Sequence, residues 1–264
     1  MLERPEDICG ARIKMLKTQN LHKIFDGFKA VTAIDFEITE GKRHAIIGPN
    51  GAGKTTFFNL ITGHLQPSQG EVFYKGDLIT GLPPHRIVKL GLARSFQRIN
   101  IYPRMTVFQN VQVALIAQHG RQLHFFTPAH NLYNNETNEL LALVDLLKEG
   151  NGVAGELAYG KQKQLELAIS LAADPELLLL DEPTAGMSPS ETGDSIKLIN
   201  DIARHRSLTL LFTEHDMNVV FGIADQITVL HHGEILASGT PEDVRANNEV
   251  RRVYLGEEVQ FDSA

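Results

Sequence analysis

The sequence predicts an α/β fold with a mainly parallel core sheet, an antiparallel β subdomain and a helical insertion. First, short apolar segments of strand-like length alternate with helix-like segments along most of the chain. Second, a glycine-rich loop separates one of these strands from the next helix. Third, the alternation of strands and helices is interrupted at residues 98–156, where the apolar residues have helical spacing only. Strands that alternate with helices typically form a parallel sheet that is covered on both faces.

Composition places the chain among ordinary globular proteins. Of its 264 residues, 42% are hydrophobic and 22% are charged, which suits one or two domains. The formal net charge of −7 does not favour a nucleic-acid partner, since such proteins usually carry a basic face. Cys9 is the only cysteine, so no disulfide can form within the chain, which fits a reducing compartment.

The apolar runs of the sequence are short. The first residues are charged throughout and have no apolar core for a signal peptide. No run approaches the ~18 apolar residues that a transmembrane helix needs. If the protein serves a membrane, we therefore expect other chains to cross it.

The first stretch, up to about Gln97, is predicted to form strands around a phosphate-binding loop. Turn residues at Asp26-Gly27 and Glu40-Gly41 separate its apolar segments. A helix follows the loop and opens at the phosphate end. In order, the expected elements are strands at 16–25, 28–39 and 44–47 and a helix at 55–61.

The remaining elements follow from changes in apolar spacing. Helical spacing within 98–156 is carried by Val107, Val111, Ala114 and Leu115, and by Leu140, Leu141, Val144 and Leu147. The core then resumes with a helix at 160–173, a strand at 177–181, a helix at 189–205, a strand at 208–213 and a hairpin at 227–237. We therefore expect a nucleotide-binding core with the β subdomain at 12–97 and 157–240, a helical subdomain at 98–156 and a tail at 241–264.

Residues 48–55 match the phosphate-loop pattern G-x-x-x-x-G-K-[ST] in full. Glycines let backbone N–H groups turn toward phosphate oxygens, and the following helix points its positive end at the same place. Lys54 is expected to reach the β- and γ-phosphates, and the Thr55 hydroxyl to hold Mg²⁺. A glycine-rich surface turn is the less favoured alternative. The predicted nucleotide contacts here are Gly48, Pro49, Asn50, Gly51, Ala52, Gly53, Lys54, Thr55 and Thr56.

Two carboxylates, Asp181 and Glu182, end the run of leucines at 177–180. An acidic residue at the carboxyl end of a parallel strand faces the ligand crevice. We expect Asp181 to hold Mg²⁺ through water, and Glu182 to position and deprotonate the attacking water. Taken without the phosphate loop, the pair could equally begin a solvated loop.

Three further residues are candidates for the nucleotide site because of their positions in the sequence. Gln97 stands at the start of the helical insertion, where it could bond both Mg²⁺ and the attacking water. His215 follows the strand at 208–213, from which it could donate to the γ-phosphate. Phe25 could stack on adenine. Each has an ordinary alternative, namely a solvent-facing glutamine, a surface or core histidine and a core aromatic.

These motifs, in this order, resemble the motif set of ATP-binding cassette ATPases over about residues 14–240. The resemblance implies a P-loop NTPase fold, and it adds the segment Leu157, Ala158, Tyr159, Gly160 and Lys161 as the signature that closes over the ATP of another subunit. The chain has no N-K-x-D segment for reading guanine, which argues against an ordinary P-loop GTPase.

A narrower resemblance is to the larger ATP-binding subunits of branched-chain amino acid importers. It rests on FFNLITG, the segment 77–86, GLARSFQ, LAYGKQKQLELA, TEHDM and the tail 252–257. It implies a peripheral position on the cytoplasmic face of the inner membrane. The implied partners are transmembrane permease chains, a second ATP-binding subunit in a homo- or heterodimer, and a periplasmic substrate-binding protein.

The signature departs from the general pattern L-S-G-G-Q. Ala158 lacks the hydroxyl expected to contact phosphate across the dimer, although Gly160 still offers a backbone N–H and Lys161 adds a positive charge. After the carboxylates, Ser188 replaces an aspartate that would bridge the subunits. Both departures bear on the strength of subunit coupling, and they are compatible with a partner ATPase that supplies the stronger signature.

Other functions within the same resemblance stay open. The cassette could serve an exporter, for instance of lipopolysaccharide, or act as a soluble ATPase in iron–sulfur assembly. A repair or translation ATPase is disfavoured, because such proteins usually carry two cassettes or a long coiled coil. The sequence does not name the transported molecule.

Overall fold

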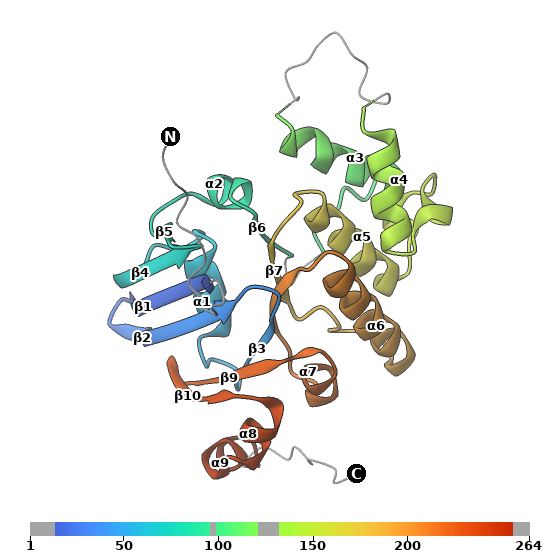
Figure 1. The fold of residues 1–264 in the computed structure, drawn as a ribbon. Helices are drawn as coiled ribbons and strands as arrows, with labels where there is room; N and C mark the ends of the chain where they lie inside the picture. The colour runs from blue at the N-terminus through green and yellow to red at the C-terminus, as the bar shows by residue number, and fades with distance from the viewer. Residues whose placement is uncertain (1–13, 96–98, 121–131, 256–264) are drawn as a thin grey trace, which may run out of the picture.

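The computed structural model describes residues 14–95, 99–120 and 132–255. Two sheets stand side by side, with helices around them (Figure 1). Within these residues one sheet has four strands in the order β2-β1-β4-β5, and the other has six in the order β10-β9-β3-β8-β7-β6. The separation into a small sheet and a larger core sheet agrees with the predicted fold class.

The four-stranded sheet is antiparallel throughout. Its long hairpin turns at Asp26 and Gly27, which both have positive φ, as the predicted turn requires. Its other pair turns at Lys75 and Gly76. The strands are β1 (Lys14–Phe25), β2 (Phe28–Thr39), β4 (Gln69–Tyr74) and β5 (Asp77–Leu78).

The six-stranded sheet is parallel except for the pair of β9 and β10. This pairing brings the carboxyl ends of β3, β7 and β8 to one edge, which we call the carboxyl edge, and their amino ends to the opposite, amino edge. The strands are β3 (Arg43–Ile47), β6 (Leu92–Arg94), β7 (Leu177–Asp181), β8 (Thr209–Thr213), β9 (Gln226–His231) and β10 (Glu234–Gly239).

Helix α1 (Lys54–Ile61) lies between the two sheets (Figure 1). Alternate side chains of the parallel strands divide the core, because successive residues of a strand point to opposite faces. Ile46, Leu179 and Leu211 pack with α1 and the antiparallel sheet. Ala45, Leu178 and Phe212 pack in the second core, on the other face. The phosphate-loop helix α1 is therefore packed between one face of the six-stranded sheet and the antiparallel sheet (Figure 1).

The second core is covered by helices α5 (Tyr159–Leu171), α6 (Pro189–His205) and α7 (Met217–Ile223). Helices α3 (Val107–Gln118) and α4 (Asn134–Leu143) pack on each other and on α5. These two helices stand out from the sheets together (Figure 1).

Helix α4 ends at Leu143 rather than continuing to Leu147 as predicted. Asp145 adopts positive φ, and the N–H groups of Asp145 and Leu146 donate to the carbonyls of Ala142 and Leu141. This is the Schellman ending, in which a left-handed residue closes the helix. Leu147 lies instead in a 3₁₀ turn, η2 (Leu147–Glu149), and a second such turn is η3 (Ala154–Glu156).

Three short helices, and α7, were not assigned from the sequence. They are α2 (Pro84–Lys89), α8 (Pro241–Ala246) and α9 (Asn248–Leu255). Thr240 begins α8 with a capping box to Asp243, and Pro241 occupies its first turn, a usual start signal. Across the described ranges, no helix combines the length and apolar character needed to span a bilayer.

Candidate active site

The phosphate loop joins the carboxyl end of β3 to the start of α1. Its glycines are required by close packing and by backbone conformation. A Cβ on Gly48 would lie 2.2 Å from the Leu230 carbonyl oxygen, and a Cβ on Gly53 would lie 2.5 Å from that of Ala30. Gly51 has a φ of +79°, but a Cβ there would meet nothing. The loop therefore forms a cradle that is tight on its protein side and open at Gly51.

Lys54 is folded back into this cradle. Its Nζ donates to the carbonyl oxygens of Gly48 at 2.5 Å and Pro49 at 3.2 Å. Burial lowers the pKa of Lys54, while the negative charges of Glu182 and Asp181 act in the opposite direction. The ammonium group is thus held by loop carbonyls and lies in the field of both carboxylates.

A cleft of about 300 Å³ opens beside the loop. It brings seven of the nine predicted loop residues, those at 50–56, together with both Glu182 and His215, whereas Gly48 and Pro49 are not in its lining. Phe28, which sequence reasoning did not single out, also lines the cleft. The lining residues are Phe28, Ala30, Asn50, Gly51, Ala52, Gly53, Lys54, Thr55, Thr56, Glu182 and His215.

The two phenylalanines of the β1–β2 hairpin differ in their surroundings. Phe28 is 67% exposed and lies in the cleft lining. Phe25, the predicted adenine contact, is 39% exposed, and the Lys23 ammonium lies 5.0 Å from its ring centroid. Phe25 is not among the lining residues, so the structure places the second aromatic closer to the loop.

Glu182 and His215 contact each other in the lining of the cleft. His215 Nε2 lies 3.0 Å from Glu182 Oε1. Glu182 has a φ of 50°, a left-handed conformation that is uncommon outside glycine and often marks functional sites. Its backbone N–H donates to the Thr213 carbonyl oxygen at 3.1 Å. The end of β8 thus fixes the turn that carries Glu182.

A buried carboxylate, Glu214, connects the loop that follows β7 to the loop that follows β8. Its Oε1 accepts from the backbone N–H of Thr184 at 2.9 Å and from the Thr184 hydroxyl at 2.7 Å. Its Oε2 accepts from the backbone N–H of His215 at 3.1 Å. Sequence reasoning passed over Glu214, although its place directly after a buried strand is the signal that drew attention to Asp181.

Asp181 is also buried, and each of its carboxylate oxygens accepts one hydrogen bond. Its Oδ1 accepts from the Thr213 hydroxyl at 2.7 Å, and its Oδ2 accepts from Arg94 Nη2 at 2.8 Å. Arg94 Nη1 donates to Asn59 Oδ1 at 2.6 Å. Sequence reasoning missed Arg94 and Asn59. The only available signal was a cation within the apolar strand β6.

The donor set at this edge fits a Mg²⁺ ion that accompanies phosphate. Thr55 offers a hydroxyl in the cleft lining, and Asp181 offers a carboxylate. Mg²⁺ usually takes one or two protein carboxylates together with substrate phosphates. In the part of the chain described, no group of three or more His, Cys, Asp or Glu side chains gathers in a way that could hold a metal. Gln97, the third predicted ligand, lies outside the described residues.

The signature segment does not line the cleft of its own chain. It runs into α5, whose N-cap residue Ala158 makes no side-chain cap bond. Gly160 faces α6, where a Cβ would lie 3.0 Å from Glu191 Oε1. Lys161 forms an ion pair with Glu149. Ala158, Gly160 and Lys161 line a separate cavity of about 510 Å³.

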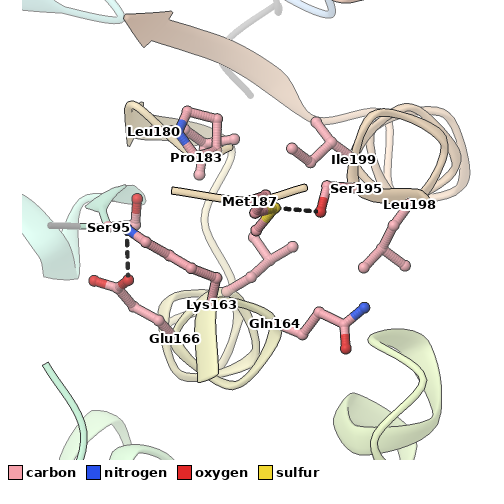
Figure 2. Close-up of a pocket in the computed structure, with 11 residues that line it drawn as sticks. Ser95, Lys163, Gln164, Glu166, Leu180, Pro183, Met187, Ser195, Leu198 and Ile199 are labelled. Atoms are coloured by element: carbon pink, nitrogen blue, oxygen red, sulfur yellow. Dashed lines mark hydrogen bonds and ion pairs between the residues drawn. The ribbon is translucent and has the colours of Figure 1, made fainter. Parts of the chain in front are cut away.

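The serine at the position of an expected aspartate lies at the start of α6. Ser188 is the N-cap of α6 and forms a capping box with Glu191. Further along, α5 and α6 enclose a pocket beside Leu180 and Pro183 (Figure 2). There Lys163 Nζ lies 3.5 Å from Glu166 Oε2. The pocket thus lies between the signature helix, α6 and the strand that ends in the carboxylates.

Two family patterns match the sequence. The ABC transporter pattern covers residues 31–185, and the branched-chain amino acid ATP-binding cassette transporter pattern covers residues 234–260. The chain is similar to the high-affinity branched-chain amino acid transport ATP-binding protein LivG of Salmonella typhimurium, with 40% identity over 253 residues, spanning 92% of this chain and 98% of that protein. For BraF of Pseudomonas aeruginosa, with the same description, identity is 41% over 254 residues, at 92% and 98% coverage.

A more distant relative is the lipopolysaccharide export system ATP-binding protein LptB of Haemophilus influenzae, at 31% identity, 94% coverage of this chain and 100% of that protein. A crystal structure of the ADP conformation of an ATP-binding cassette of an ABC transporter superposes with a TM-score of 0.80, at 27% identity, covering 92% of this chain and 99% of that one. A dimeric post-hydrolysis cassette bound to ADP and Pi shares the fold, with a TM-score of 0.73, 24% identity and coverages of 86% and 99%.

Proposed function

Because the chain belongs to the ABC transporter family of ATP-binding subunits, we propose that it hydrolyses ATP at the carboxyl edge to drive a membrane importer. The observation that carries this proposal is a single cleft lined by the phosphate loop, Glu182 and His215. The products are ADP and phosphate. Membrane permease chains and a second cassette are its partners in this function.

The proposed chemistry assigns one role to each group. Backbone N–H groups of the loop and the Lys54 ammonium hold the β- and γ-phosphates. Glu182 accepts a proton from the water whose oxygen attacks the γ-phosphorus, while the bond from that phosphorus to the β-phosphate oxygen breaks and ADP leaves. His215, whose Nε2 contacts Glu182 in the described structure, would turn its N–H to the γ-phosphate when nucleotide is bound. Thr55, Asp181 and Gln97 would hold Mg²⁺, which when bound neutralises charge on the phosphates.

The signature is proposed to act on the ATP of the second cassette. Ala158, Gly160 and Lys161 line a cavity apart from the cleft of their own chain, which supports a role toward another subunit. Gly160 lies in the first turn of α5, where anions are favoured. Lys161 is engaged with Glu149, so it would leave that ion pair to contact phosphate.

Within the chain, we propose the division given by the sequence, with residues 98–156 as the helical subdomain. Gln97 stands at its junction with the core, and a residue that senses phosphate there could convert nucleotide state into motion of the subdomain.

We propose that the transported molecules are branched-chain or other hydrophobic amino acids, or related small molecules. Support comes from the names of the relatives at about 40% identity and from the family pattern over 234–260. A periplasmic binding protein would deliver the substrate, and the chain would lie on the cytoplasmic face of the inner membrane. Lipopolysaccharide-type export is the second candidate, favoured only by the relative at 31% identity.

The test is a gentle detergent pull-down of the chain from its native membrane, followed by mass spectrometry. Recovery of two permease chains, a second ATPase and a periplasmic binding protein is the expected result. Exporter membrane chains without a binding protein would favour the second candidate. Recovery with soluble proteins alone would contradict the transport function and leave the ATPase chemistry.

A further inference from the structure

We propose that Arg94 is a positioning residue that acts as a built-in counter-cation for Asp181, so that the site takes a divalent cation only together with nucleotide. This inference rests on the proposed function, in which Asp181 holds the metal. It concerns the order in which ligands enter the site.

The geometry places the Arg94 guanidinium between two elements of the site. Nη2 donates to Asp181 at the end of β7, and Nη1 donates to Asn59 of α1. The arginine therefore connects the helix that carries the phosphate loop to the strand that carries the carboxylates. Its carbon Cζ also lies 5.5 Å from the ring centroid of Phe58, a second contact with α1.

Arg94 and Asp181 are both buried, so the stability of the site depends on their pairing. The side chains of Arg94 and Asp181 are only 7% and 4% exposed. A buried carboxylate needs a compensating charge, and removing one partner of a buried pair is strongly destabilising. Arg94 supplies that charge from within the chain, so the carboxylate is stable before any cation arrives.

The same pairing lowers the attraction of Asp181 for a free metal ion. Thr213 already donates to Oδ1 and Arg94 to Oδ2, and a cation would have to approach a nearby guanidinium. A metal–nucleotide complex instead brings phosphate oxygens that contact Lys54 and the loop. Only one Arg94 N–H bonds to Asp181, which makes the contact easier to exchange than a two-bond fork.

Thermal unfolding without nucleotide, with and without Mn²⁺ alone, tests this proposal. Arg94→Gln should lower the melting temperature by roughly 10 °C, and Mn²⁺ should restore several degrees by binding the uncompensated carboxylate. Wild type should not respond to Mn²⁺. Arg94→Lys, which keeps the charge, should also not respond, whereas a purely structural role for Arg94 would give both variants the same response.

A double-variant cycle identifies the partner. Arg94→Gln/Asp181→Asn should be more stable than Arg94→Gln alone and should lose the Mn²⁺ response, because the buried charge is gone. If Arg94→Gln does not fold, Asn59→Ala carries the test: Mn²⁺ should raise its melting temperature, unlike that of wild type, because the guanidinium is less firmly held. The inference would be overturned if the stability losses of the two substitutions simply added, or if Mn²⁺ failed to raise the melting temperature of Arg94→Gln.

One further comparison separates this inference from the proposed function. Asp181→Asn should weaken the Mg²⁺ dependence of nucleotide affinity. If it does so while the Arg94 variants ignore Mn²⁺, the inference fails and the proposed function stands. If Asp181→Asn leaves the Mg²⁺ dependence unchanged, the metal assignment itself fails.

Discussion

The core sheet carries two clusters of arginine, aspartate and asparagine, one at each edge. The carboxyl-edge cluster consists of Arg94, Asp181 and Asn59, and the amino-edge cluster consists of Arg43, Asp225 and Asn200. In the amino-edge cluster, Arg43 Nε and Nη2 donate to the two Asp225 oxygens at 3.1 and 2.6 Å, and Nη1 donates to Asn200 at 2.7 Å. The residue types are the same, but the bonding differs.

The amino-edge pair is a closed fork at the protein surface. Its side chains are 23% and 27% exposed, and the Arg43 backbone N–H also donates to Asp225 at 2.9 Å. Burial alone would raise the pKa of Asp225, but the hydrogen bonds and charge of Arg43 outweigh it and hold the pKa below its usual value. This pair fastens the start of β3 to the start of β9, and none of the proposed catalytic residues belongs to it.

The carboxyl-edge pair is buried, shares its aspartate with Thr213 and uses a single N–H on it. Position on the sheet explains the contrast, because ligands bind outside the carboxyl ends of parallel strands. The two-bond fork between Arg43 and Asp225 holds two strand ends together. Asp181, with one bond from Arg94 and one from Thr213, can exchange a partner for a ligand more easily. We therefore expect substitutions at the carboxyl edge to affect function, with a loss of stability as well where the buried Arg94–Asp181 pair is broken. Substitutions at the amino edge should affect stability alone.

The largest expected effects come from changing one carboxylate to an amide at each edge of the core sheet. Glu182→Gln should bind ATP but lose roughly 10²- to 10⁴-fold in turnover, because it removes the positioned general base. Asp225→Asn should keep its turnover but lose about 2 kcal/mol of unfolding free energy, because Arg43 loses its charged partner. Steady-state phosphate release and urea unfolding measure the two effects.

The comparison breaks if the pattern is reversed. Undiminished hydrolysis by Glu182→Gln would remove the general base from the mechanism. A large loss of turnover in folded Asp225→Asn would show that the amino edge also communicates with the site.

The second test concerns the pH dependence of stability and involves a histidine of β3. His44 is buried, with Nε2 2.8 Å from the Thr228 hydroxyl, and burial lowers its pKa to about 4. Between pH 6.5 and about 4 the unfolded chain binds a proton that the folded chain does not, so stability falls as the pH falls. The loss should reach about 3 kcal/mol at the lower limit.

Chemical denaturation across this pH window measures the effect. His44→Leu is the matched control, because the Thr228 hydroxyl still lies 2.8 Å from that of Ser238. Its stability should depend less on pH between 6.5 and 4. An equally steep profile in that variant would assign the pH dependence to other groups.

A third test compares a lysine at each edge. Lys54→Ala should weaken ATP binding roughly 10- to 100-fold, because charged hydrogen bonds to phosphate are lost. Lys42→Ala, beside the amino-edge cluster, should leave the affinity unchanged. Titration calorimetry of both variants measures this difference, and equal affinities would contradict the role of the loop lysine.

Sequence and structure agree where chemistry is local. The phosphate loop is a continuous pattern in which glycine spacing, Lys54 and the following helix are all read along the chain. The end of β7 could be predicted because Asp181 follows a run of leucines. In both cases a single segment contains the whole signal.

Partnerships between distant segments could not be read in this way. Arg94 meets Asp181 across neighbouring strands, 87 positions apart in sequence, and Glu214 reaches Thr184 from another strand end. Each residue has many possible partners in the sequence, and only the strand order selects one. The end of α4 was missed for a different reason, since a single aspartate in a left-handed conformation outweighed continued helical spacing.

The smallest predicted effect distinguishes the two phenylalanines near the cleft. If Phe25 stacks on adenine as the sequence predicts, Phe25→Ala should weaken ATP binding several-fold, since aromatic contacts contribute about 1 kcal/mol. It should leave the binding of inorganic tripolyphosphate, which has no base, unchanged. Phe28→Ala is the matched variant from the same hairpin. A base-dependent loss in Phe28→Ala alone would assign the adenine to the aromatic that lines the cleft, and would extend the carboxyl-edge site to the antiparallel sheet through β2 rather than β1.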